Sequence, residues 1–451
     1  MTTSPRSVAS RSTADTWTAV ADQGLYSATS FVTTLLLARH VSVGDLGWFS
    51  AGISLLITTV GFMSSFVAIP LTLAIQGATP RDRSDQLAGG LGASVALAGV
   101  VAVGLLGAAL FGFAWIGRSA ALPGWLLVLA VVVVPMVVRE YARQMAFAQP
   151  GLPGLAVMDL TYSVVALGGL GLLARAGRLD AIWGLAVVGG AALASVLAWS
   201  VTARATIRWH AVASAPRFLQ RHLRMSRWLC GASILYACSI SAVPWFLGLL
   251  AASASVGLFA AYATIAGVLN PLLAVASNLT APRAARAVTA ESYHPVRRTA
   301  LIASATAGIG LGVVAVGLGF AETTLVPLLF GPAFEAAPYL LWLLLASAVC
   351  EGLGIGAFWG LHALGESRTA FWARAAAVVL SLPVGAWAIL RLGVLGAAWL
   401  MLALRALNAG FNWVSFLVAS RSPGPVGMAL PTVVPSRPDT PMVGFGPDGA
   451  R

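Results

Sequence analysis

The sequence predicts an all-α polytopic membrane protein with about twelve transmembrane helices, arranged as two lobes of about six helices each. Only 9% of its residues are charged, compared with about 25% in ordinary soluble domains. The segment from Trp228 to Pro282 contains no Asp, Glu, Lys, Arg or His, and it is long enough for two helical crossings of a hydrocarbon core about 30 Å thick. Similar continuous runs recur along the chain and favour helices over a β-barrel, whose strands alternate in polarity.

The apolar runs divide the chain into spans of the length that a bilayer requires. In chain order, the predicted spans cover residues 17–38, 48–75, 87–116, 121–147, 153–174, 181–203, 228–250, 256–280, 299–320, 337–362, 370–390 and 394–419. The first run is expected to remain as a span and not to be cleaved as a signal, because Asp15 and Asp22 interrupt it and no small-residue cleavage pattern follows.

Arginine placement predicts the orientation of these spans. The chain has a net charge of +12 and no lysine, and its arginines concentrate in alternate connections between the spans. This bias predicts that both termini lie in the cytoplasm. The opposite, outer side then carries only Arg39, Arg118, Arg175, Arg178 and Arg391. Since the positive charge follows the membrane topology, it does not indicate a nucleic-acid partner.

Charge and composition also predict the domain organisation. Residues 208–227 form a basic cytoplasmic linker between an N-lobe at 17–207 and a C-lobe at 228–420. Residues 1–16 are expected to be a cytoplasmic N-terminal segment. The proline-rich tail at 421–451 has no long apolar run and is expected to be disordered in the cytoplasm.

The two predicted lobes resemble each other in sequence at an offset of 210 residues. Leu25-Tyr26 matches Leu235-Tyr236, and Gly47-x-Phe49-x-Ala51 matches Gly257-x-Phe259-x-Ala261. Two halves with the same topology are parallel repeats, and transporters built this way place the substrate path between the halves. The repeat therefore favours a transporter over a membrane enzyme.

Polar residues inside the predicted C-lobe spans are candidates for function, because ionisable groups are costly in lipid. Arg405, Asn408 and Asn412 form one stripe along the last span. The stripe is interpreted either as a cavity wall that binds an anionic or sugar substrate, or as an interhelical hydrogen-bond strip with Arg405 paired to a carboxylate. Glu351 is the best candidate for that partner, or for the carrier of a coupling proton. Asn270, followed by Pro271, marks a predicted kink and is a further candidate contact for substrate.

The N-lobe spans carry a second group of candidates. Arg139 and Arg143 share a helix face at the end of the fourth span, with Glu140 in reach of Arg143. They are interpreted as a basic vestibule that attracts phosphate or, preferably, as an interfacial salt bridge whose arginines snorkel to water. Asp159 is expected to be a helix-end charge.

The first span contributes two more candidates on one helix face. Asp22 could bind a coupling cation or proton, or could cap the helix, and Tyr26 is a candidate substrate contact one turn later.

Several chemistries have no signature in the sequence. There is no Walker motif, no large outer loop that could hold a catalytic domain, and no histidine–carboxylate cluster. We therefore expect neither an enzyme nor a cofactor or metal site. The cysteines lie in apolar runs without paired spacing, so no disulfide is predicted: Cys230, Cys238 and Cys350.

Two segments carry a resemblance to a known family. One runs from Asp22-Gln23-Gly24-Leu25-Tyr26-Ser27 through Leu36-Leu37-Ala38-Arg39 to Gly47-Trp48-Phe49, and the other is Leu329-Phe330-Gly331-Pro332-Ala333-Phe334. The chain resembles the polysaccharide and oligosaccharide-lipid flippases of the multidrug/oligosaccharidyl-lipid/polysaccharide (MOP) exporter superfamily. The resemblance covers roughly residues 17–420. It implies two six-helix lobes of the MATE type around a cavity lined mainly by the first, second, seventh and eighth spans.

The resemblance further implies flipping of a lipid-linked oligosaccharide or polysaccharide precursor across the bacterial cytoplasmic membrane by alternating access. The partners are then the bilayer, a glycan on a polyprenyl (pyro)phosphate and possible polysaccharide assembly proteins. The cavity spans hold few charges here, so either positive charge comes from Arg139, Arg143 or Arg405, or the cavity is merely polar. A cation-coupled multidrug exporter that uses Asp22 or Glu351, and a non-transporting scaffold of an export complex, remain the alternatives.

Overall fold

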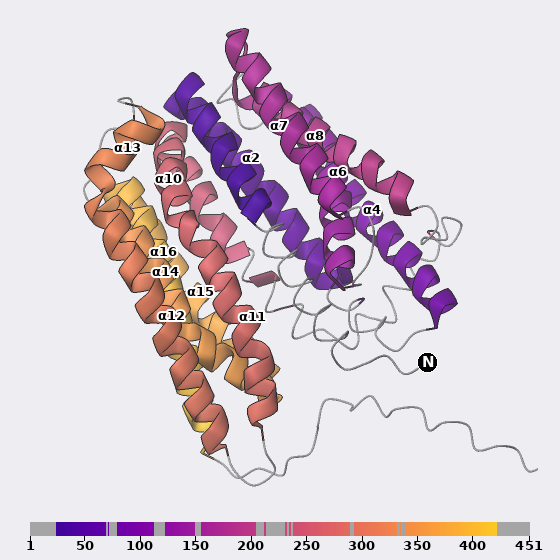
Figure 1. Cartoon of the computed structure of the whole chain (residues 1–451). Helices are drawn as coiled ribbons and strands as arrows, with labels where there is room; N and C mark the ends of the chain where they lie inside the picture. The colour runs from indigo at the N-terminus through magenta and orange to yellow at the C-terminus, as the bar shows by residue number, and fades with distance from the viewer. Residues whose placement is uncertain are drawn as a thin grey trace, which may run out of the picture.

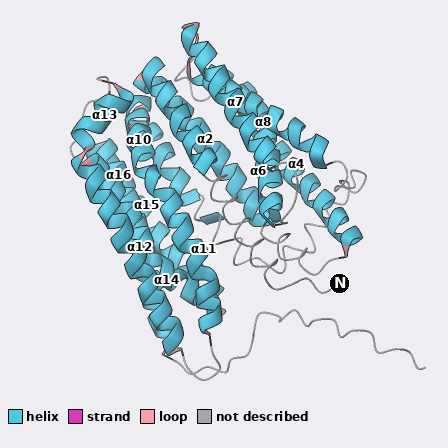
Figure 2. Ribbon diagram, in the orientation of Figure 1, coloured by secondary structure: helices cyan, strands magenta, loops and turns pink. Residues whose placement is uncertain are grey.

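The computed structural model describes residues 24–68, 71, 79–111, 122–148, 155–203, 212, 231, 234–235, 238–288, 293–331, 334, 337 and 339–421. Every labelled element in this part of the chain is helical (Figure 2). Helices satisfy their own backbone hydrogen bonds, which is the requirement for a chain that crosses lipid.

The N-lobe begins with a helix over residues 24–40. It continues with α2 (Val43–Met63), the π-helical turn η1 (Ser64–Ala68), α4 (Pro80–Phe111), α6 (Leu122–Ala148), α7 (Leu155–Arg175) and α8 (Ala181–Ala203). In this lobe α4 packs on α6, and α8 packs on both α6 and α7.

The C-lobe begins with a helix at Cys238–Leu250. It continues with α10 (Ser253–Ala266), the 3-10 turn η4 (Gly267–Leu269), α11 (Asn270–Ala287), α12 (His294–Phe320), α13 (Glu322–Phe330), α14 (Leu340–Ala363), α15 (Ser367–Leu392) and α16 (Val394–Ala419). Here α14 packs on α12 and α16, and α15 packs on α16.

Ten helices among the described residues are long and apolar enough to cross a membrane. Each coincides with a predicted span. The spans predicted at 17–38 and 228–250 are described only in part, as the helices at 24–40 and Cys238–Leu250, so the total of twelve stays a prediction. The predicted terminal segments and linker fall almost entirely outside the described residues.

The break predicted at Asn270-Pro271 is present. The 3-10 turn η4 ends at Leu269 and α11 starts at Asn270, within one apolar stretch from Ser253 to Ala287. Because Pro271 lacks a backbone N–H, it cannot donate a hydrogen bond to Gly267, and the helix is irregular there. The sequence did not predict α13, the short helix between α12 and α14.

The helix surfaces fit a lipid environment. Large apolar side chains are exposed along the bundle, among them Val100, Val131, Phe320 and Leu390. Monomeric soluble proteins rarely expose apolar surface so widely, whereas lipid-facing helices do. The interior is filled by buried Leu, Val, Ala and aromatic side chains.

The two lobes lie closest at one end of the bundle and diverge toward the other (Figure 1). We call the first the upper end, after its place in Figure 1; it holds residues 39–42, residues 176–180, residues 251–252 and α13. Arg39, Arg175 and Arg178 lie at this end, so the arginine bias predicts that it faces outward.

Helices α2 and α10 make the main helix-to-helix contact between the lobes, and they cross at the upper end. Tryptophan rings next to this crossing also join the lobes. Within the N-lobe, the Trp125 indole N–H donates to the Trp48 carbonyl at 3.0 Å, and the Trp125 ring in turn lies 6.1 Å from that of Trp245 in the C-lobe. The upper end is therefore closed by direct packing.

Candidate functional site

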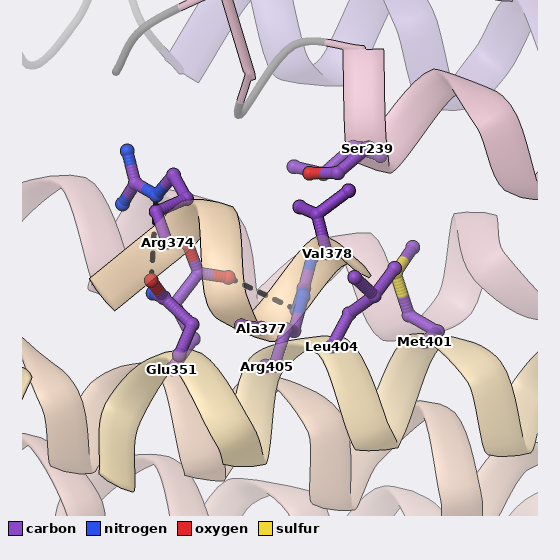
Figure 3. A pocket seen from close by; sticks show the side chains of 10 residues that line it. Ser239, Glu351, Arg374, Ala377, Val378, Met401, Leu404 and Arg405 are labelled. Carbon is purple, nitrogen blue, oxygen red and sulfur yellow. Dashed lines mark hydrogen bonds and ion pairs between the residues drawn. The ribbon is translucent and has the colours of Figure 1, made fainter. Parts of the chain in front are cut away.

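A polar pocket lies inside the C-lobe, between the Cys238–Leu250 helix and helices α14, α15 and α16 (Figure 3). Its lining combines charged, polar and apolar side chains: Ser239, Ile240, Glu351, Arg374, Ala377, Val378, Met401, Leu404, Arg405 and Asn408. The free space is about 20 Å³, enough for about one water molecule. In this conformation the pocket can hold water but has no room for a sugar.

An ion pair between α14 and α16 forms the base of this pocket. Arg405 Nη1 lies 3.2 Å from Glu351 Oε2, and the two side chains are 16% and 22% exposed. The predicted partnership of these residues is thereby confirmed. Both side chains are therefore partly accessible, unlike those of a fully buried pair, in which removal of one partner costs about 3–5 kcal/mol.

Arg374 on α15 is a pocket residue that the sequence reasoning missed. Its Nε lies 3.4 Å from Asn408 Oδ1, and its guanidinium carbon lies 5.1 Å from the centre of the Phe358 ring. Arg374 stands two turns inside α15, on the same face as Val378 and Ser381. The sequence signal for this position was the seven-residue spacing of Arg374 and Ser381, which places the two side chains on one face of the helix.

The predicted polar stripe on α16 is divided by the structure. Arg405 and Asn408 line the pocket, whereas Asn412 lies one turn further along and is 1% exposed. The side-chain oxygen of Asn412 has no hydrogen-bond partner among the described residues. The pocket lining contains two arginines, Arg374 and Arg405, and one carboxylate, that of Glu351. The pocket therefore has a net positive charge, which favours binding of an anion.

The N-lobe contains a separate buried ion cluster. Asp159 on α7 forms a hydrogen bond with Arg139 Nη2 and an ion pair at 3.3 Å with Arg143 Nε, both from α6. All three residues are buried, with exposures of 2% for Arg139, 6% for Arg143 and 1% for Asp159. The preferred prediction of interfacial, snorkelling arginines was therefore wrong, as was Asp159 as a mere helix-end charge. Charges inside a bundle are stable when paired, and the second turn of α7 brings the carboxylate to α6.

Tyrosine rings complete the N-lobe cluster. The Arg139 guanidinium carbon lies 3.9 Å from the centre of the Tyr162 ring, and that of Arg143 lies 4.4 Å from the Tyr26 ring. Electron-rich ring faces attract guanidinium groups, most strongly where water is excluded. The helix at 24–40 is also held to α7 by the hydrogen bond between Thr29 and Ser163, at 2.7 Å.

Two predicted site residues remain, Asp22 and Asn270. Asp22 lies outside the described residues. Asn270 is exposed at the start of α11. No group of three or more His, Cys, Asp or Glu side chains that could hold a metal occurs within the described part of the chain.

Comparison with known proteins places the fold. No protein-family model and no curated protein matches the sequence. Solved structures do match. An inward-facing multidrug-resistance MATE transporter of the MOP superfamily has a TM-score of 0.69 at 14% identity, over 87% of this chain and 93% of that one. The lipid II flippase MurJ in an inward closed conformation has a TM-score of 0.63 at 12% identity, over 89% of each chain. An outward-facing MATE transporter of the superfamily has a TM-score of 0.59 at 13% identity, over 91% and 94%.

Proposed function

We propose that this chain, which has the fold of the MOP exporter superfamily, moves a lipid-linked oligosaccharide or polysaccharide precursor across the bacterial cytoplasmic membrane by alternating access. The observation that carries the proposal is the positively charged pocket made by Arg374, Arg405 and Glu351 inside a helical lobe of a transporter fold.

The chemistry of such a substrate suits this pocket. A pyrophosphate-linked sugar cannot cross hydrocarbon unaided, because burying unpaired charge costs on the order of tens of kcal/mol. Arginine binds phosphate through two parallel hydrogen bonds. Arg374 and Arg405 would contact the phosphate, and the Asn408 amide would hydrogen-bond to phosphate or sugar. The polyprenyl tail would stay in lipid.

The position of Glu351 supports a mechanism in which the substrate phosphate replaces the Glu351 carboxylate as the partner of Arg405. It holds Arg405 while the pocket is closed, so the guanidinium is not left unpaired. A phosphate that takes over Arg405 releases the Glu351 carboxylate from the ion pair. Since the present pocket admits about one water, its helices must separate before a head group enters.

The conformation of the lobes fits the cytoplasmic loading step of such a cycle. The upper end, predicted to face outward, is closed by the crossing of α2 and α10. The chain also matches the inward-facing MATE structure better than the outward-facing one, with the two TM-scores given above. Rocking one repeat against the other would open the upper end and close the lower one.

We assign the other predicted residues supporting roles in this proposal. Arg139 and Arg143 are engaged by Asp159 and would stabilise the N-lobe more than they bind substrate. Tyr26 would hold the first helix against them. Asn270, exposed at the helix irregularity, would contact the head group. Asp22 remains the N-lobe candidate for ion coupling.

Flipping in proteoliposomes tests the proposal. The vesicles contain a polyprenyl-pyrophosphate oligosaccharide, and an impermeant glycosidase reports the accessible head groups. We expect cleavage beyond the exposed fraction of protein-free vesicles. Arg405→Ala and Arg374→Ala should slow flipping by roughly 10- to 100-fold, as loss of one charged hydrogen-bond donor to phosphate predicts.

Arg421→Ala is the matched control, because Arg421 is exposed just beyond α16 and is not among the residues that line the pocket. Its flipping rate should equal that of the native chain. Absence of excess cleavage by folded native protein, across several candidate glycans, would refute the flippase proposal. Equal, native-like rates for Arg405→Ala and Arg421→Ala would refute the pocket assignment.

A cation-coupled multidrug exporter is the second candidate, and the partly exposed Glu351 carboxylate together with the fold of the multidrug MATE transporters favours it. Such an exporter needs an acidic residue that binds the coupling ion. Replacement of both Asp22 and Glu351 by the corresponding amides should then abolish drug resistance in a sensitive strain. Unchanged resistance would exclude this candidate. A scaffold role would gain support if Arg405→Ala and Glu351→Ala both left function intact at normal protein levels.

A further inference from the structure

Arg39 joins the two lobes at the upper end of the molecule. It stands near the end of the N-lobe helix at 24–40, and its Nε–H donates to the Leu329 carbonyl at 2.7 Å. Its Nη2 donates to the neighbouring carbonyl, that of Leu328. Both carbonyls belong to the last turn of α13 in the C-lobe. One side chain of one lobe thus binds the backbone of the other lobe through two donors.

The C-terminal turn of α13 is well suited to this contact. The last carbonyls of a helix have no partner within it and carry the negative end of the helix dipole, so a cation is favoured there. The helix stops at Gly331, whose φ of +89° disfavours any residue with a Cβ. The rings of Phe330 and Phe334, both 2% exposed, lie 5.6 Å apart and anchor the turn in the C-lobe core.

These are the two segments that carry the family resemblance, and the structure brings them together. The Ala38-Arg39 end of the first helix meets the turn that contains Phe330, Gly331 and Phe334. In sequence they are far apart, and neither contributes to the polar pocket. The pocket chemistry therefore leaves their role unexplained.

We propose that Arg39 and the C-terminal turn of α13 form a latch that stabilises the closed upper end. The proposal rests on the alternating-access function proposed above. When the lobes separate at this end, Arg39 must leave α13, because each group belongs to a different lobe. Arg39 is exposed, so water can replace both sets of hydrogen bonds once they break. Such a contact shifts the equilibrium toward closure without preventing opening.

The latch predicts a change in the population of open and closed molecules that distance measurements can detect. Spin labels at Ala176 in the N-lobe and Thr323 in the C-lobe, both exposed at the upper end, report the separation of the lobes. The labels are placed in the full chain after replacement of the native cysteines by serine. Pulsed electron double resonance then gives the distance distribution in purified protein without substrate.

Removal of the latch should favour the longer distance. We expect Arg39→Ala and Arg39→Gln to raise the ratio of long-distance to short-distance molecules by roughly tenfold, since two hydrogen bonds from a charged donor are lost. Arg39→Lys keeps the charge at the helix end and should shift the ratio less. Arg178→Ala is the control, because Arg178 is another exposed arginine at the same end, and its distribution should equal that of the native chain.

The outcomes separate the latch from the transport proposal. An unchanged distribution in both Arg39→Gln and Arg39→Ala, or an equal shift in Arg178→Ala, would overturn the latch even if the native chain flips lipid. A shift confined to the Arg39 variants would support the latch even if the native chain shows no flipping, in which case the proposed substrate is at fault. If Arg39→Ala does not fold, the comparison of Arg39→Gln with Arg39→Lys decides.

Discussion

Gly47 and Gly257 occupy equivalent positions in the two repeats, and they face each other where α2 crosses α10. A Cβ on Gly47 would lie 1.9 Å from the Ser253 carbonyl oxygen, and a Cβ on Gly257 would lie 1.9 Å from the Val43 carbonyl oxygen. Val43 and Ser253 are themselves equivalent at the same offset of 210. The contact is therefore reciprocal, as at a twofold axis. The pseudo-twofold axis of the repeat passes through this crossing.

Alanine at either glycine should prevent full closure of the upper end. The new Cβ would meet backbone, which cannot rotate away as a side chain can, and such overpacking costs about 1–3 kcal/mol. We expect Gly47→Ala and Gly257→Ala to raise the open population to a similar extent in the distance measurement described above, because the contact is symmetric. Gly99→Ala, which has open space around it, is the control. Closure as tight as in the native chain would contradict this prediction.

The ion pair of Glu351 and Arg405 should contribute a coupling energy between α14 and α16. We expect a double-mutant cycle with Glu351→Ala and Arg405→Ala to give about 0.5–3 kcal/mol of coupling, the range for residues in contact or in one ion-pair network. The measured quantity is the free energy of unfolding in detergent for the native chain, both single variants and the double variant. If the effects of the two single variants sum to the effect of the double variant within about 0.3 kcal/mol, the pair does not stabilise the fold.

Asp159→Asn should destabilise the protein more than any change in the C-lobe pocket. The substitution removes the carboxylate that Arg139 and Arg143 contact inside the N-lobe, and breaking a buried charge pair costs about 3–5 kcal/mol. Thermal unfolding in detergent measures the loss. Glu366→Gln, at an exposed carboxylate, should change stability by less than about 0.5 kcal/mol. Similar melting temperatures for the two variants would mean that the buried cluster contributes little.

Glu322 should make stability depend on pH. Its side chain is 7% exposed at the start of α13, and burial raises its pKa above the ordinary 4.5, while a hydrogen bond from the Leu341 backbone N–H acts in the opposite direction. Between 4.5 and the higher folded pKa, the folded chain binds more protons than the unfolded chain. The contribution of this group to the free energy of unfolding therefore falls as pH rises through that window.

Glu322→Gln removes the titrating carboxyl and keeps an acceptor for the Leu341 N–H. The melting temperature of the variant minus that of the native chain should therefore increase with pH across the same window and stay constant below 4.5. Melting curves at a series of pH values measure this difference. A difference that does not change with pH would show that the folded pKa of Glu322 is ordinary.

The sequence by itself determined the helical spans, since long apolar runs have one stable form in lipid. It also indicated the repeat, and it paired Glu351 with Arg405, because few charges lay within the C-lobe spans. It did not find Arg374 as a pocket residue or Asp159 as the partner of two buried arginines. Spacing along one helix tells which residues share a face, but not which neighbouring helix that face meets.

Only the tertiary structure decided how the lobes meet. The repeat made Gly47 and Gly257 equivalent in sequence, yet equivalent residues touch only when both lie beside the twofold axis, and the packing of the lobes sets that axis. In the same way, the Ala38-Arg39 end and the turn at Gly331 were separate motifs until the fold placed a guanidinium at the end of α13. Contacts between lobes depend on helix rotation and crossing, which arise from the simultaneous packing of all the helices.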